Sequence, residues 1–447
     1  MADKKLALIS LTAFAVLSGC GGTDGGAGTG GAGSGSAGKE GDGQHTAKPG
    51  EPVEIVIHSN GGDNEDMFNG QYGNALRKKF PDYTIKYIPH GQGKSISELL
   101  AQKQQIDILY QSIAYYPQLS ETSGLQYDMT ELVKKHGVNL GTFQQTLIDG
   151  IRSSGGGKLH ALPVTNTVQV MYYNKGLFDK FGVPYPKDGM FWDDTIELAR
   201  KLTRKEGDKM YLGFAASAPH LLGNNQLSQP YLDPAAEKAT FTGDAWKKML
   251  SAYFLEPAAD QGYKERVTAL KAVPYRLELT NSQELAMFAF HSQFPFAVPK
   301  DMEKIQWDLV ALPTFKDKPG IGSQMAPFVF GITSISPNKD AAMEVIKYLA
   351  SPEQQMNFSK QGIMPVIEDD QVKKAYAQES AFKDKNWNAI FYNKPAPIAS
   401  KSKYQLSVEG MLTKRIPDIV KGTVDLNTAL REAAEEADKA VAEAKRN

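Results

Sequence analysis

Histidine is the side chain best suited to proton transfer and metal binding, and this sequence of 447 residues contains seven histidines. No two of them have the spacing of a zinc-ligand pair, and the single cysteine offers no thiolate partner. The sequence therefore predicts no transition-metal centre and no cofactor. The histidines are His45, His58, His90, His136, His160, His220 and His291.

Two further motifs suggest chemistry without completing it. The segment "IPHGQGKS" ends like a phosphate-binding loop, but the first glycine of that motif would fall at Ile88, so the nest of backbone amides is incomplete. We interpret it as a turn between a strand and a helix. A Gly-x-Ser-x-Gly nucleophile elbow is also missing, so an acyl-transfer enzyme would have to work without one.

Paired carboxylates could hydrolyse a glycosidic bond, and Asp193-Asp194 and Glu435-Glu436 are pairs by adjacency. Neighbouring residues on a helix point about 100° apart, so these pairs do not face each other across a bond. We expect them on solvated helix faces. The acidic cluster at 63–66 could instead bind calcium, although it lacks the spaced ligands of a helix-loop-helix site; a polar loop at the edge of a cleft is the alternative.

Charge and composition restrict the partner. Lys and Arg number 50 and Asp and Glu number 51, giving a formal net charge of -1, which provides no field to attract nucleic acid or an anionic surface. Aromatic residues make up 10% of the chain, enough to line a cleft as well as fill a core. We expect a neutral partner, or one that is recognised locally.

The N-terminus contains the only cysteine. Lys4 and Lys5 precede an apolar run from Leu6 to Leu17, which is too short to span a bilayer and is typical of a secretory signal. Cys20 follows Ser18 and Gly19, and this end resembles the lipobox of bacterial lipoproteins, in which the cysteine is diacylated after cleavage. The resemblance implies a signal peptide at 1–19 and a lipid anchor on Cys20. A chance signal end with a free thiol is the alternative.

A glycine-rich segment, residues 20–50, begins at the cysteine. It contains mainly Gly, Ala, Ser and Thr with scattered charges, so it offers too little apolar surface to offset the entropy of ordering. A flexible tether of this length would span roughly 30 Å. We expect it to hold the folded part of the protein near the membrane.

From residue 52 onward strands and helices alternate, and this pattern must position any site. The segments "PVEIVIHSN", "YTIKYIP" and "IDILYQ" are predicted strands, and the intervening segments 68–80 and 95–102 are predicted helices. In the second helix Ser95 stands three residues before Glu98, the spacing of a capping box. The alternation predicts an α/β fold with largely parallel, doubly wound sheets, and about 400 residues favour two lobes.

The segment 159–203 resembles the family 1 extracellular solute-binding proteins of ABC importers, the group that includes maltose-binding proteins. The motif is carried by Leu162-Pro163, Tyr173-Asn174-Lys175, Pro184 and Trp192. A second match at 307–362 contains the Ser336-Pro337-Asn338-Lys339 helix start and a Ser-Pro-Glu turn at 351–353. The two matches agree with the family in order and spacing. Together they cover the organisation of the chain from about 52 to 447.

The resemblance implies a type II fold of two lobes, with the chain crossing between them near 165–170, near 323–328 and between 371 and 392. Lobe 1 would comprise 52–167 plus 327–375, and lobe 2 would comprise 168–326 plus 376–447. A solute would lie between the lobes at the carboxyl ends of strands.

The function implied is that of a lipid-anchored, monomeric receptor on the outer face of the cell membrane, or on the periplasmic side where there are two membranes. It would capture a carbohydrate, with oligosaccharide as the leading choice, by hinge closure. It would then deliver the solute to the transmembrane subunits of an ABC permease without catalysing a reaction.

Candidate ligand-binding residues stand in loops at predicted strand ends. Sugar sites combine rings that stack on pyranose faces with polar groups that bind hydroxyls. By family position, Phe294 stands where a stacking tryptophan is found, Tyr404 lies near another such ring, and Gln111 replaces a third. A core role for Phe294 and backbone hydrogen bonding for the polar residues are the alternatives. The candidates are Asn60, Asp63, Gln111, Tyr115, Tyr116, Asn166, Gln169, His291, Phe294, Met325, Phe328 and Tyr404.

Two other functions remain open at this stage. The same fold could bind a peptide, a polyamine, a phosphorylated polyol or a chelated metal, with cleft carboxylates favouring a cation and paired arginines favouring phosphate. A surface enzyme acting on polysaccharide would need two carboxylates about 5 to 9.5 Å apart across a groove.

Overall fold

The computed structural model describes residues 53–61 and 63–446. The predicted signal peptide, Cys20 and the glycine-rich tether lie outside these residues. Within them, every helix is too short or too polar to cross a membrane.

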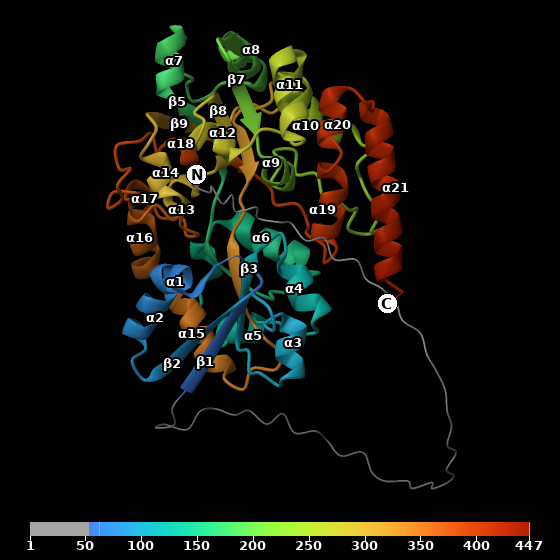
Figure 1. Ribbon diagram of the computed structural model, residues 1–447. Coiled ribbons are helices and arrows are strands. Elements are labelled where there is room, and N and C mark those ends of the chain that lie inside the picture. The colour runs from blue at the N-terminus through green and yellow to red at the C-terminus, as the bar shows by residue number, and fades with distance from the viewer. Residues whose placement is uncertain (1–52, 62, 447) are drawn as a thin grey trace, which may run out of the picture. The chain divides into compact units, whose positions relative to one another are not determined.

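The first of two five-stranded sheets has the order β2-β1-β3-β11-β4 (Figure 1). Its strands β1, β2 and β3 are parallel, which confirms the predicted alternation at the start of the chain. Strand β11 lies antiparallel between β3 and β4, so the sheet is mixed. The strands are β1 (Val53–Ser59), β2 (Tyr83–Pro89), β3 (Ile108–Ser112), β4 (Leu162–Thr165) and β11 (Phe328–Ile332).

The second five-stranded sheet has the order β6-β7-β8-β5-β9, and β5 runs antiparallel to both of its neighbours. A largely parallel sheet was expected, but both sheets contain antiparallel strands. Strand β5 follows β4 of the first sheet, and β11 follows β10 of a separate pair, so neither reaches its sheet through the helical crossover that makes neighbouring strands parallel. Strands β10 (Ile321–Gln324) and β12 (Lys394–Ala396) form a separate parallel pair. The second sheet comprises β5 (Gln169–Asn174), β6 (Arg204–Glu206), β7 (Lys209–Ala216), β8 (Leu285–His291) and β9 (Trp307–Ala311).

Helices flank both sheets (Figure 1). Those before β5 are α1 (Glu65–Phe68), α2 (Asn74–Lys79), α3 (Ile96–Ala101), α4 (Tyr116–Thr122), α5 (Thr130–Lys135) and α6 (Gln145–Ser154). Those from β5 to β9 are α7 (Lys175–Phe181), α8 (Trp192–Leu202), α9 (Ala218–Gly223), α10 (Asp244–Leu250), α11 (Gln261–Leu270), α12 (Arg276–Thr280), α13 (Phe294–Ala297) and α14 (Pro299–Met302). The remainder are α15 (Lys339–Leu349), α16 (Pro352–Lys360), α17 (Asp370–Lys374), α18 (Ala389–Tyr392), α19 (Gln405–Thr413), α20 (Ile416–Lys421) and α21 (Leu426–Ala444).

Local sequence signals account for several of these helices. Ser95 and Glu98 form the predicted capping box at the start of α3. Helix α21 buries an apolar stripe of Leu430, Ala433, Ala437 and Val441, which recur at intervals of three and four residues. The predicted helix at 68–80 buries Phe68, Tyr72 and Leu76, and it contains a π-helical turn at Asn69–Gly73 that the periodicity did not indicate.

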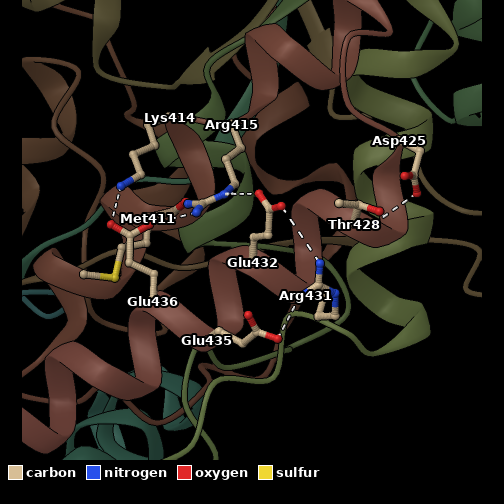
Figure 2. A network of polar contacts seen from close by, with 9 residues as sticks. All are labelled: Met411, Lys414, Arg415, Asp425, Thr428, Arg431, Glu432, Glu435 and Glu436. Atoms are coloured by element: carbon tan, nitrogen blue, oxygen red, sulfur yellow. Dashed lines mark hydrogen bonds and ion pairs between the residues drawn. The ribbon is translucent and has the colours of Figure 1, made fainter.

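Charged side chains fasten α19 and the segment after it to α21 (Figure 2). Arg415 pairs with Glu436 at 2.8 Å, and Lys414 bonds to the same carboxylate. Glu435 pairs with Arg431 at 2.8 Å on its own helix. The adjacent glutamates therefore have separate structural partners. These ion pairs hold α19 in position, and α19 contributes Glu409 and Leu406 to the lining of a cleft.

Gly213 is required where β7 packs against α8. A Cβ atom at Gly213 would lie 2.0 Å from the backbone oxygen of Ala199, and a helix backbone cannot yield as a flexible side chain can. We expect Gly213→Ala to lower the free energy of unfolding by about 1–3 kcal/mol, measured by urea denaturation.

Gly410→Ala is the matched control. Gly410 is exposed inside α19, and nothing lies within 4 Å of its added Cβ. Alanine should therefore raise stability by up to about 1 kcal/mol. Equal stability of the two variants would contradict the packing argument.

Candidate functional site

A cleft of about 710 Å³ is lined by residues that follow strands of both five-stranded sheets. The first sheet contributes residues after β1 and at the end of β3, and the second contributes the end of β8 and the helix α9 after β7. Helix α19 adds side chains from a segment more than a hundred residues further on. The cleft therefore occupies the carboxyl ends of strands, where ligands bind in open α/β sheets.

Polar groups held by hydrogen bonds form the wall on the side of the first sheet. Asp63 accepts a hydrogen bond from the Tyr110 hydroxyl at 2.8 Å through its side chain and one from Tyr87 at 2.9 Å through its carbonyl. The Oε1 atom of Gln111 accepts from the backbone N–H of Ser112 at 2.9 Å. Asn60 Oδ1 lies 3.2 Å from Nε2 of His58. These contacts fix the side chains before any solute arrives.

Two histidines meet on the side of the second sheet. The ring centroids of His220 and His291 lie 4.2 Å apart, and the two rings meet edge to face. Gln169 donates an amide hydrogen bond to Nδ1 of His291 at 2.9 Å, and Ser217 Oγ lies 2.6 Å from Nδ1 of His220. Burial lowers the pKa of His220 to about 4 and lowers the pKa of His291 well below 6.5. Both rings are therefore neutral at pH 7 and suited to hydrogen bonding with a neutral solute.

Glu409, on α19, is a buried carboxylate that lines the cleft, with 6% of its surface exposed. The Tyr115 hydroxyl donates to its two oxygens at 3.3 and 3.4 Å, which joins the side of the first sheet to α19. Burial raises the pKa of Glu409 to about 7, against the opposing effects of this hydrogen bond and of Lys401. Burial lowers the pKa of Lys401 to about 8, and its Nζ donates to the carbonyl of Gly223 at 2.9 Å.

Metal chemistry finds no support in the described part of the chain. Among residues 53–61 and 63–446, no group of three or more His, Cys, Asp or Glu side chains is placed to hold a metal ion. In the acidic cluster, Asn64 caps α1 by accepting from the backbone N–H of Met67, and Glu65 and Asp66 stand in the first turn. The residues of this cluster other than Asp63 thus serve the start of a helix.

The structure brings half of the sequence-derived candidates together on the cleft wall. They come from both sheets and from the loops beside them. These residues are Asn60, Asp63, Gln111, Tyr115, His291 and Phe328.

The other candidates lie elsewhere. Phe294 begins α13 and is buried against Tyr172 and Phe290, so it has the core role that was its alternative. Tyr116 is also buried, and its hydroxyl donates to the carbonyl of His160 at 3.1 Å. Tyr404 packs half-buried against the apolar core, away from the cleft lining.

The last three candidates are Asn166, which lies between β4 and β5, Gln169, which begins β5, and Met325, which follows β10. Asn166 is fully buried, and neither atom of its side-chain amide has a hydrogen-bond partner. Gln169 and Met325 line a second cavity, of about 450 Å³, together with Val168, Leu312 and Asn393. Gln169 also bonds to His291, so it lies between the second cavity and the cleft.

Several cleft residues escaped the sequence analysis. His220 and Thr167 follow strands β7 and β4 within a few residues, and a stricter application of the strand-end rule would have found them, whereas Asn224 caps the end of α9. Glu409 stands in the middle of a helix, where no local signal distinguishes it from a solvated glutamate. Only the packing of α19 beside α9 places it in the cleft.

Known proteins share this architecture. An open sugar transporter protein of Rhizobium etli superposes with a TM-score of 0.65 at 20% identity, covering 86% of this chain and 99% of that one. A Listeria monocytogenes ABC substrate-binding protein in complex with cycloalternan gives 0.67 at 16% identity, covering 88% and 100%. A cyclic alpha-maltosyl-1,6-maltose binding protein of Arthrobacter globiformis gives 0.63 at 15% identity, covering 87% and 99%. The two-lobe binding-protein fold that the sequence indicated is thereby confirmed.

The family assignment rests on the sequence as well. Residues 67–356 match the model of the family described as bacterial extracellular solute-binding protein. Proteins of this kind are the solute-binding components of ABC transporters and perform no catalysis. The alternative hypothesis of a surface enzyme acting on polysaccharide is therefore wrong. This chain belongs to the bacterial extracellular solute-binding protein family.

Proposed function

We propose that this protein captures an oligosaccharide in the cleft and delivers it to an ABC permease. The observation that carries the proposal is the cleft wall itself, which combines imidazoles, amides and hydroxyls with the rings of Tyr115 and Phe328. Polar groups of this kind bind sugar hydroxyls, and rings stack on the apolar faces of pyranoses. Structural neighbours solved with cycloalternan, mannobiose and maltose support the choice of solute.

Capture would proceed by hinge closure. The cleft walls come from the two sheets, and the chain would pass between lobes at the expected crossings, with lobe 1 as 52–167 plus 327–375 and lobe 2 as the remainder from 168. A solute that contacts both walls stabilises the closed state in proportion to the contacts it gains there. The hydrogen bond from Tyr115 to Glu409 joins the two walls and would favour closure in the same way.

Attachment to the outer face of the membrane would rest on Cys20 and the tether that follows it. We expect the Cys20→Ser protein to appear in the soluble fraction, while the unaltered protein partitions with membranes. Quantitative membrane partitioning of Cys20→Ser would remove the lipid anchor from the proposal. Permease recognition would require the monomer to present both lobes to the transmembrane subunits.

A thermal-shift screen of the purified full chain tests the solute. A sugar at 100 times its dissociation constant should add about 2.7 kcal/mol to the free energy of unfolding. Gln111→Leu should reduce the response because it removes a cleft amide, whereas Gln371→Leu, on the exposed face of α17, should retain it. A response to peptides or phosphorylated polyols, with none to sugars, would refute the carbohydrate assignment.

A further inference from the structure

The charged groups of the cleft are unbalanced. Among the described residues that line it, the carboxylates are Asp63 and Glu409, and neither lysine nor arginine is present. His220 and His291 are neutral at pH 7 because burial lowers the pKa of each ring. The third histidine of the lining, His90, is exposed, so a solute deep in this cleft meets acidic side chains with no lysine or arginine on the wall to offset them.

Glu409 is held in place. Its helix is fastened to α21 by Lys414 and Arg415, which both bond to Glu436 (Figure 2). Its carboxylate accepts hydrogen bonds from one hydroxyl, that of Tyr115, and so retains acceptor capacity. Gly223 leaves space beside it, since a Cβ atom there would lie 3.8 Å from Glu409 Oε2. The carboxylate is thus a buried acceptor at the edge of an open space.

No cationic side chain among the described residues bonds directly to the Glu409 carboxylate. Lys401 directs its Nζ to the carbonyl of Gly223 and to Oε1 of Gln324, at 2.9 and 3.4 Å, so it acts on Glu409 through its charge and not through a hydrogen bond. Tyr231 presents a buried hydroxyl without a hydrogen-bond partner, 4.0 Å from the same Cβ position on Gly223. The groups facing the carboxylate are therefore two phenols, from Tyr115 and Tyr231, the imidazole of His220 in the same lining, and the lysine engaged elsewhere.

We infer that the solute carries an ammonium group that binds Glu409, and that it is an oligosaccharide containing an unacetylated amino sugar. This inference rests on the proposed function, because it adds a charged group to a carbohydrate. A buried carboxylate with no directly bonded cation is costly, and an ammonium group both offsets the charge and donates to the free acceptor sites of the oxygens. A neutral sugar hydroxyl donates one hydrogen bond and leaves the charge uncompensated.

Ionisation provides an independent signature. The pKa of Glu409 is raised to about 7 by burial, so part of the unliganded protein carries a protonated carboxyl at neutral pH. An ammonium ligand binds the ionised form, so affinity should rise as the pH increases toward 7 and fall again where the amine of the sugar loses its own proton. A neutral sugar that accepts a hydrogen bond from the protonated carboxyl would show the opposite trend.

Calorimetric titration of the full chain with matched sugar pairs tests the inference. Each pair has an amine or a hydroxyl on the same carbon: glucosamine and glucose, galactosamine and galactose, mannosamine and mannose, and the β-1,4 dimers to tetramers of glucosamine and glucose. We expect the amino member of the best pair to bind roughly ten- to a hundredfold more tightly, as for a charge-assisted hydrogen bond. Glu409→Gln should reduce this ratio to within about threefold, and Glu443→Gln, exposed on α21, should not alter it.

Each other outcome counts against the inference. Equal or tighter binding of the neutral members would overturn it while leaving the carbohydrate receptor intact. An equal loss for both members in Glu409→Gln would make Glu409 a simple hydroxyl acceptor. Binding of spermidine with no sugar would refute the proposed function and this inference together, and so would silence across all the pairs. If Glu409→Gln fails to fold, the affinity of the unaltered protein on the acidic side of pH 7, where the sugar amine stays protonated, decides: a rise with pH supports the inference and a fall overturns it.

Discussion

Replacing Trp192 with alanine is expected to lower the free energy of unfolding by about 3–5 kcal/mol, the usual cost of removing a large ring from a core. Trp192 begins α8 and is 2% exposed. Its ring lies 4.8 Å from that of Tyr253 and 5.8 Å from that of Phe214, and its indole N–H donates to Gln226 at 2.8 Å. Alanine would leave a cavity between α8 and β7 and remove a buried donor. Urea denaturation of the purified variant measures the loss.

Two controls separate packing from ligand contact. Trp192→Phe keeps most of the ring, and Gln226 retains its hydrogen bond from Tyr253 at 3.3 Å, so the loss should be smaller. Leu277→Ala removes a side chain that is 51% exposed and should change stability by less than about 0.5 kcal/mol. Trp192 does not line the cleft, so solute affinity per folded molecule should survive in Trp192→Phe. Lost affinity in that variant without lost stability would contradict a packing role.

The Glu409 carboxyl is expected to make stability fall as the pH rises from about 4.5 to about 7. Its folded-state pKa of about 7 is raised above the ordinary 4.5 because the group is buried. Over this interval the folded state therefore keeps a proton that the unfolded chain releases, and the stability gained from that proton is lost as the pH passes through the folded pKa. The difference in unfolding free energy between the unaltered protein and Glu409→Gln should decrease by about 3 kcal/mol from roughly pH 4 to roughly pH 8.

Tyr115→Phe is the informative companion to this experiment. It keeps the carboxyl but removes the hydrogen bond that lowers the pKa of Glu409. The fall in stability should then extend to higher pH than in the unaltered protein. A difference between Glu409→Gln and the unaltered protein that stays constant across this pH range would show that Glu409 has an ordinary pKa in the folded state.

Local patterns predicted much of the fold. The strand at 53–59 and the capping box at Ser95 and Glu98 follow from neighbouring residues, and they hold in the structure. The apolar stripe on α21 is also a local property, because a helix places residues three and four apart on one face. The directions of β5 and β11 were not predictable in this way, since each pairs with strands far away in the sequence.

The cleft residues also separate into those that local sequence predicted and those that only packing revealed. Asn60, Gln111 and His291 were accessible to the sequence because each ends or follows a strand, and strand ends gather at one edge of a sheet.

The sequence by itself determined the family, the α/β class and the strand-end part of the cleft, because these depend on short-range periodicity and ordered motifs. Only the tertiary structure decided that Phe294 is core and that Glu409 meets Tyr115 from 294 residues away. A side chain's burial and charge environment are set by the elements packed around it, and those contacts are not encoded in the spacing of its neighbours.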